Sequence, residues 1–204
     1  MTLSARDRAR KIKVILFDVD GVLTDGRIWV FPAPVNEGGK VESRMVEFKG
    51  YNAHDGTAFS LLKIAGIKSG IITKRISETV AMRARDLKLE FAYQGQSYKM
   101  KPIREIAANE GIGLDEIAYV GDDVIDLPAM REVGFAVATA NARERVKAEA
   151  HYVTEHAGGD GAARDAIEFI LDAQGILDSS INAYIDEGNP LPPSMDIGKG
   201  GDVK

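Results

Sequence analysis

Two aspartates, Asp18 and Asp20, stand two positions apart directly behind the apolar run VILF at residues 14–17. A short apolar run of this kind is typical of a buried strand, so both carboxylates fall where that strand should end. Buried charge is costly unless another group compensates for it. The stretch is therefore either an acidic turn or a site built around a cation.

Further polar groups follow the later strand-like segments. They are Thr73, Lys74 and Arg75 after the second segment, Lys99 after the third, and Asp122, Asp123 and Asp126 after the fourth. In an open α/β sheet, ligands bind outside the carboxyl ends of the strands. Acids from the first and fourth strand ends can face each other across Mg²⁺, which prefers oxygen ligands and makes clustered acids tolerable. The hydroxyl and ammonium groups between them suit phosphate oxygens.

The elements that must position these groups alternate along the chain. Strand-like segments are separated by amphipathic stripes, such as residues 58–65 and the stripe Ile76, Val80, Ala84 and Leu87. This alternation predicts right-handed crossovers and a parallel sheet covered on both faces. The expected fold class is therefore α/β, a Rossmann-like parallel sheet with helices on both faces and a small inserted β-hairpin.

Two regions break this alternation. In residues 27–48 the segments RIWVF and KVESRMVEF are β-rich, and the PAPVNEGG between them is expected to be the turn region of an inserted hairpin. From residue 178 onward, proline and glycine accumulate with little periodicity, which predicts a flexible tail. The expected organisation is one domain over residues 1–177, with the hairpin at 27–48, and a tail over residues 178–204.

Composition removes several classes of function. The net charge is −5 and no basic stripe argues for a nucleic-acid partner. The chain has no cysteine, which excludes disulfides and thiolate ligands, and its three histidines make a histidine-rich zinc site unexpected. No apolar run is long enough to span a bilayer. A cytoplasmic protein without membrane or nucleic-acid partners is expected.

Four motifs together resemble the haloacid dehalogenase superfamily of phosphohydrolases. They are DVDGVLTDG, the IIT segment with Arg75, Lys99, and GDDVID, in this order over residues 14–130. Each motif alone is weak, because DxDG also recurs in calcium loops. The agreement of all four, each at an expected strand end, favours the cation site over the acidic turn.

The resemblance implies a role for each matching residue. Asp18 would be the nucleophile that forms an aspartyl-phosphate, and Asp20 would protonate the leaving alcohol and then deprotonate water. The implied Mg²⁺ ligands are the Asp18 carboxylate, the Asp20 backbone carbonyl and Asp122. Asp123 and Asp126 would orient waters or Lys99, with helix capping as the rival role for Asp126. Thr73 would donate a hydrogen bond to the phosphoryl group, whose charge Lys99 would offset.

The short hairpin in place of a large cap and the AGGDGAARDAIEFIL segment narrow the resemblance to the capless phosphatases of sugar-acid phosphates. That resemblance implies a homotetramer whose hairpins and tails help to close neighbouring sites. In the GGDGAAR segment, residues 158–164, backbone amides would hold an anion, and Arg164 would grip a substrate carboxylate. Lys74 stands where these phosphatases have glycine, and either binds substrate or faces solvent. Further departures from the pattern are His54, Tyr98 and Asp165.

Three functions follow from the resemblance. The first is hydrolysis of an eight-carbon ulosonic acid 8-phosphate in lipopolysaccharide precursor synthesis. The second is the same chemistry on a nine-carbon, sialic-acid-like 9-phosphate. The third is a non-catalytic oligomerisation module of a sugar-nucleotide pathway. Retention of Asp18, Asp20, Lys99 and Asp122 argues against the module, because a scaffold has no use for an acid cluster that costs stability.

Overall fold

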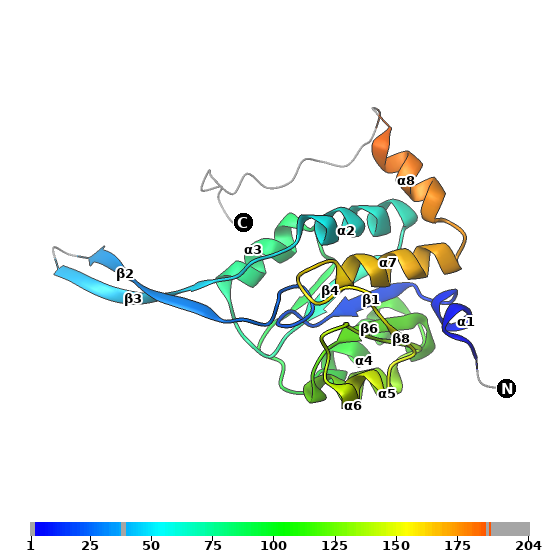
Figure 1. Cartoon of the computed structure of the whole chain (residues 1–204), viewed down its shortest axis with the longest axis horizontal. Helices are drawn as coiled ribbons and strands as arrows, with labels where there is room; N and C mark the ends of the chain where they lie inside the picture. Colours follow the sequence, from blue (N-terminus) through cyan, green and yellow to red (C-terminus); the bar gives the residue numbers. More distant parts are fainter. Residues whose placement is uncertain (1–2, 38–39, 187, 189–204) are drawn as a thin grey trace.

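A six-stranded parallel sheet forms the centre of the molecule (Figure 1). The structure, a computed structural model, describes residues 3–37, 40–186 and 188. In spatial order the strands are β5 (Phe91–Tyr93), β4 (Lys68–Ile72), β1 (Val14–Phe17), β6 (Ile117–Gly121), β7 (Phe135–Ala138) and β8 (Tyr152–Val153). Strand β1 therefore lies between β4 and β6, where the strand order reverses direction, and the α/β prediction is confirmed.

Each face of the sheet has its own apolar core, because alternate strand residues point to opposite faces. Ile15 and Phe17 of β1 belong to one core, whereas Val14 and Leu16 belong to the other. The first core is covered by α1 (Ala5–Ala9), α2 (Ala53–Ala65), α3 (Glu78–Asp86) and α7 (Ala162–Ala173). The second is covered by α4 (Met100–Glu110), α5 (Leu127–Glu132) and α6 (Glu144–Lys147), on the opposite side of the sheet in Figure 1.

Helix α3 begins two residues later than the apolar stripe predicts. Ser77 is its N-cap, and the Ser77 hydroxyl accepts a hydrogen bond from the Val80 amide. A capping serine accepts a hydrogen bond from an amide that the first turn leaves without an acceptor, and so fixes where a helix starts. Ile76 is left outside the helix with 83% of its surface exposed, and its inclusion in the buried stripe was wrong.

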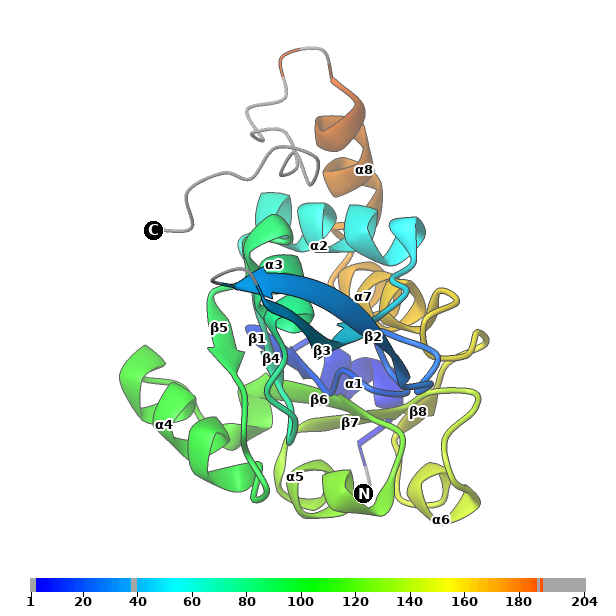
Figure 2. The same cartoon turned by 90° about the vertical axis from the view of Figure 1, so that its left-hand side faces the viewer.

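The inserted segment forms a long antiparallel ribbon of β2 (Trp29–Glu37) and β3 (Lys40–Phe48), which projects from the body of the molecule (Figure 1) and toward the viewer in Figure 2. The hairpin prediction is correct, but PAPVNE belongs to β2 rather than to a turn. Both strands of a two-stranded ribbon are edge strands, which tolerate proline. The two-residue spacing of Pro32 and Pro34 puts both missing donors on one edge of β2.

The chain beyond the domain boundary expected at residue 177 does not start as a flexible tail. Helix α8 (Leu177–Ile185) spans that boundary and packs against α2 through Ile181 and Tyr184. The rest of the expected tail, residues 189–204, lies outside the described residues.

Two short 3₁₀ helices, Leu114–Glu116 and Val124–Asp126, flank β6. Within the described ranges, no helix has the length and apolar character needed to cross a membrane.

Candidate active site

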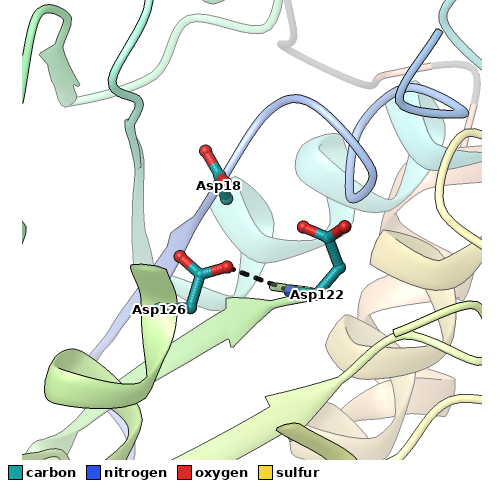
Figure 3. Close-up of side chains that lie close together, drawn as sticks. All are labelled: Asp18, Asp122 and Asp126. Atoms are coloured by element: carbon teal, nitrogen blue, oxygen red, sulfur yellow. Dashed lines mark hydrogen bonds between the residues drawn. The ribbon is translucent and has the colours of Figure 1, made fainter. Parts of the chain in front are cut away.

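Three of the residues expected to do chemistry meet at the carboxyl edge of the sheet. Asp18 follows β1, Asp122 follows β6, and Asp126 lies one turn further along the 3₁₀ helix after β6 (Figure 3). One carboxylate oxygen from each of the three lies within 4.8 Å of the others. Parallel neighbouring strands bring their carboxyl ends to the same edge, so residues about a hundred positions apart become neighbours.

The pKa values of two of these carboxyls are raised. Burial raises the pKa of Asp18 to about 6, against the opposing attraction of the Lys99 ammonium. Burial and then the charges of Asp126 and Asp18 raise the pKa of Asp122 to about 7. The cluster therefore holds more negative charge than its surroundings compensate.

Lys99 lies beneath the cluster and is almost fully buried. Its ammonium nitrogen lies 2.8 Å from Asp18 Oδ2 and 2.6 Å from Asp126 Oδ1. Burial opposes its charged form, but the two carboxylates outweigh burial and raise the pKa of Lys99. The side chain is therefore a cation at this site, in contact with the carboxylate expected to attack phosphorus.

Asp126 is saturated by hydrogen bonds from protein groups. Its Oδ1 accepts from Lys99 Nζ and the Tyr119 hydroxyl, and its Oδ2 accepts from the Asp122 and Asp123 amides. Although it lies close enough to share a cation, these contacts favour a role in holding Lys99 and the loop after β6. The Asp123 carboxylate is exposed and caps Val124, so in this structure it does not contact Lys99.

The site fits a divalent cation. Asp122 Oδ1 is buried and has no hydrogen-bond partner, which leaves a carboxylate oxygen without the contact it needs. Gly21 has a positive φ of 90°, and a side-chain carbon at this position would lie 2.1 Å from Asp122 Oδ2. The glycine of the DVDG motif thus leaves room for the Asp122 carboxylate beside the loop that carries Asp18 and Asp20. Carboxylate oxygens of this kind are the ligands that Mg²⁺ prefers.

Asp20 lies in a second group of charges that the sequence did not reveal. Its carboxylate pairs with the ammonium of Lys49, whose side chain is fully buried. Asp20 Oδ2 also lies 3.6 Å from Arg75 Nε, and Arg75 donates to Glu47 Oε1 at 2.8 Å. Glu47 lies near the end of β3 and Lys49 directly after it. The only sequence signal for them was their two-residue spacing at the end of a β-rich segment.

The remaining residues predicted after β4 differ in accessibility. Thr73 is buried, and its amide donates to the Tyr93 carbonyl of the neighbouring strand β5. Lys74 and Arg75 are exposed. The structure therefore places Thr73 at the strand end, joins Arg75 to the Asp20 group, and leaves Lys74 at the surface.

The glycine-rich loop before α7 packs against the loop after β1. The Gly158 amide donates to Asn141 Oδ1 and the Gly159 amide to the Val22 carbonyl. At the start of α7, buried Asp55 accepts from the Arg164 amide at 2.9 Å. These amides therefore already have protein acceptors, and the anion at this helix start is an internal carboxylate.

The Arg164 side chain lies along α7. Its Nε donates to Glu168 Oε1 at 2.5 Å, one helical turn away. Among the described residues, no ion pair joins Arg164 to the acidic cluster. A role in gripping a substrate carboxylate stays a prediction, and it would require the guanidinium to exchange Glu168 for the substrate.

Gly158→Ala is expected to lower the free energy of unfolding by about 1–3 kcal/mol, as overpacking of a close contact does. A side-chain carbon at this position would lie 1.8 Å from the Gly21 carbonyl oxygen, which is backbone and cannot turn aside. Urea unfolding measures the change. Gly50→Ala, at a position with open space around the new carbon, serves as the control. Equal stability of the two variants would contradict the close packing of the two loops.

Asp165→Asn is expected to lower the pKa of His156. The Asp165 carboxylate lies 3.0 Å from His156 Nδ1, and this hydrogen bond, with the attraction between the charges, raises the pKa of His156 above 6.5. A raised histidine pKa stabilises the fold below pH 6.5, and this contribution is lost as the pH rises through the folded-state pKa. NMR titration of the His156 ring in the parent and in the variant measures the change in pKa. An unchanged pKa in the variant would show that the pair does not form in solution.

The parallel sheet, the acids after β1 and β6 and the buried lysine beside them define a class of hydrolase. A family model described as haloacid dehalogenase-like hydrolase matches residues 69–165. The 3-deoxy-D-manno-octulosonate 8-phosphate phosphatase of Yersinia pestis is 38% identical over 178 residues, which cover 87% of this chain and 89% of the relative. The Escherichia coli K12 phosphatase of the same name is also 38% identical, over 85% of this chain.

Solved structures agree with this relationship. The phosphatase from Moraxella catarrhalis, solved in complex with magnesium, phosphate and a KDO molecule, is 36% identical and matches with a TM-score of 0.78 over 88% of this chain and 97% of that one. The Yersinia pestis structure is 37% identical, with a TM-score of 0.76 over 85% of this chain and 88% of that one. The chain belongs to the family of the 3-deoxy-D-manno-octulosonate 8-phosphate phosphatases, within the haloacid dehalogenase-like hydrolases.

Proposed function

We propose that this chain is a Mg²⁺-dependent phosphatase that hydrolyses 3-deoxy-D-manno-octulosonate 8-phosphate to the free sugar acid and phosphate. The observation that carries the proposal is the position of Asp18, which touches the buried Lys99 ammonium and lies beside Asp122 with its unpartnered oxygen. Membership of the phosphatase family supports the choice of substrate. The activity would place the chain in lipopolysaccharide precursor synthesis.

The reaction proceeds in two displacements at phosphorus. In the first, an Asp18 carboxylate oxygen attacks phosphorus, the bond to the substrate's C8 oxygen breaks, and Asp20 gives that oxygen a proton. In the second, Asp20 takes a proton from water, the water oxygen attacks phosphorus, and the bond to Asp18 breaks with release of phosphate. The two carboxyls lie in different surroundings, because Asp18 is beside Lys99 and Asp122 at the strand ends, whereas Asp20 pairs with Lys49 at the base of the hairpin.

The other strand-end residues bind the group being transferred. Thr73 donates a hydrogen bond to a phosphoryl oxygen, and Lys99 offsets the negative charge that accumulates on the group. The Asp18 and Asp122 carboxylates and the Asp20 carbonyl would hold Mg²⁺, with Asp126 and Asp123 supporting the loop. When bound, Mg²⁺ neutralises charge on the carboxylates and the phosphoryl oxygens. Arg75, Lys74 and Arg164 are the cations assigned to the sugar-acid part of the substrate.

The hairpin supports a homotetramer as part of the same proposal. Trp29, Phe31, Met45 and Phe48 each expose about half or more of their surface on the ribbon. An isolated two-stranded ribbon is marginally stable, and clustered exposed apolar side chains mark an interaction surface. Light scattering coupled to size exclusion tests the assembly. Trp29→Ser is expected to shift the mass distribution toward smaller species. The activity per subunit is expected to fall, because the hairpin of a neighbouring subunit no longer closes the active site.

A cytoplasmic location belongs to the same proposal and is tested by cell fractionation.

Phosphate release from the eight-carbon 8-phosphate and a nine-carbon ulosonic acid 9-phosphate, each with Mg²⁺ and with EDTA, tests the proposal. A Mg²⁺-dependent preference for the eight-carbon ester is the expected result. A preference for nine carbons would retain the chemistry and refute the substrate. No metal-dependent release from either substrate, or from a generic phosphate ester, would refute the activity and favour a scaffold.

A further inference from the structure

Lys49 is a buried cation whose ammonium group points at the carboxylate of Asp20. Its side chain has no exposed surface, and its nitrogen pairs with Asp20 Oδ1 and lies 3.5 Å from Glu47 Oε1. A lysine is almost never fully buried unless it is paired. The two carboxylates satisfy this condition, so the position of Lys49 depends on the residue expected to handle protons in the reaction.

The hairpin places Lys49 there by the alternation of an extended chain. Glu47 and Lys49 are two residues apart, so they project to the same side, while Phe48 between them projects to the other. Phe48 lies opposite Trp29 in the ribbon and is 60% exposed. The base of the hairpin therefore presents an apolar side outward and a charged side toward the site.

Glu47 joins this pair to the loop after β4. Its carboxylate accepts from Arg75 Nη2 at 2.8 Å and from the Ser77 hydroxyl that caps α3. Hydrogen bonds from Ser77 and Arg75 and the charges of Lys49 and Arg75 outweigh burial and lower the pKa of Glu47. Glu47 is thus held as an anion between Lys49 and Arg75, which fixes both cations around Asp20.

We propose that Lys49 is a positioning residue for Asp20, holding its carboxylate where it can transfer a proton to the leaving oxygen. Lys49 occupies Asp20 Oδ1, so Oδ2, which is 3.6 Å from Arg75 Nε, is the oxygen that carries the transferred proton. Lys49 has no exposed surface and acts through Asp20 rather than by touching the substrate. This inference rests on the proposed phosphatase function, in which Asp20 is the acid and base.

The identity of the leaving group separates this role from a merely structural one. An alkyl phosphate such as the sugar-acid ester must receive a proton as the bond to phosphorus breaks, whereas the phenolate of 4-nitrophenyl phosphate leaves without one. Lys49→Met keeps the length of the side chain and removes its charge. It is expected to lower kcat/KM for the alkyl ester, which reports the first displacement and not the attack of water, at least about 10-fold, part of the 10²–10⁴-fold that general acid catalysis contributes. The loss of kcat/KM for the aryl ester is expected to stay within about 3-fold.

Two further variants complete the experiment. Lys49→Arg keeps a cation beside Asp20 and is expected to recover most of the alkyl-ester rate. Lys68→Met is the matched control, because Lys68 is paired with Glu110 at the opposite end of the sheet. It is expected to leave both rates unchanged. Thermal melting of each variant shows that the comparison is made on folded protein.

The outcomes distinguish this inference from the proposed function. A parent chain that hydrolyses neither ester with Mg²⁺ would refute the phosphatase function itself. A parent that hydrolyses both, with Lys49→Met lowering the two rates by the same factor, would overturn only the positioning role. Failure of Lys49→Arg to exceed Lys49→Met on the alkyl ester would also overturn it. If Lys49→Met does not fold, Glu47→Gln, which removes the charge beside Lys49, gives the same decision. A lower ratio of alkyl to aryl rates than in the parent is expected, and an unchanged ratio would overturn the role.

Discussion

Replacing Asp18 by asparagine is expected to lower the rate of phosphate release by at least about 10³-fold, as the loss of a catalytic nucleophile does. The amide has nearly the same shape but is neutral and a poor nucleophile, and it loses the ion pair with Lys99 at 2.8 Å. Lys99 keeps its second partner, Asp126, at 2.6 Å, so the substitution is expected to remove chemistry rather than architecture. Release of phosphate from the sugar-acid ester at saturating Mg²⁺ measures the effect.

Asp115→Asn is the matched control for Asp18→Asn. Asp115 lies in the 3₁₀ helix before β6, at the opposite end of the sheet, and pairs with Lys11 on the surface. Its replacement is expected to leave the rate within a factor of about 2, since an exposed ion pair contributes little. An Asp18→Asn protein that keeps a hundredth or more of the parent rate would show that another group attacks phosphorus.

Lys99→Met is expected to impair both folding and catalysis. The ammonium lies between Asp18 and Asp126, at 2.8 Å and 2.6 Å, and its removal leaves two buried carboxylates without their cation. Breaking a buried pair in this way costs about 3–5 kcal/mol. The rate is expected to fall by more than about 10²-fold, because a charge that stabilises the phosphoryl group in a water-excluded site is lost. Urea unfolding and initial rates at saturating Mg²⁺ measure the two effects.

A second substitution separates the two losses. Adding Asp126→Asn to Lys99→Met removes one of the uncompensated charges, so part of the stability is expected to return while the activity is not. Lys101→Met, at an exposed position of the same helix, is the control and is expected to change neither quantity. A Lys99→Met protein with near-parental activity would contradict the role of this lysine, whatever its stability.

The placement of the acidic cluster was predictable because it depends on strand ends. Asp18 follows an apolar run and Asp122 follows another, and parallel strands bring such ends to one edge of the sheet. The same argument predicted a parallel sheet with helices on both faces. The roles assigned to these residues in the reaction stay predictions until the substitutions are measured.

The contacts of Asp20 were not predictable, because they come from an insertion. Lys49 reaches Asp20 only through the path of the hairpin, and neither the spacing nor the composition of residues 27–48 fixes that path. Asp55 is a similar case, since its carboxylate caps α7 from a helix more than a hundred residues earlier. Long-range pairs of this kind depend on tertiary packing rather than on local pattern.

Two local errors have local causes. The PAPVNEGG segment between two β-rich segments was interpreted as a turn region, whereas an exposed ribbon accommodates Pro32 and Pro34 within a strand. The compositional shift after residue 178 indicated a tail, but Ile181 and Tyr184 provide enough apolar surface to dock α8 on α2. The first segment lies in a ribbon with no further strand beside it among the described residues, and the second packs on an apolar surface of α2. Neither condition can be inferred from the local sequence pattern.

The central claim is that the phosphoryl group passes through a covalent bond to Asp18. The most direct test mixes excess enzyme and Mg²⁺ with substrate carrying a radiolabelled phosphate, quenches with acid at successive times at low temperature, and locates the label by peptide mapping. We predict a transient label on the peptide that contains Asp18, rising before free phosphate appears and absent from Asp18→Asn. Label on a peptide without Asp18, or phosphate release with no label above the Asp18→Asn background at any time, would contradict the account.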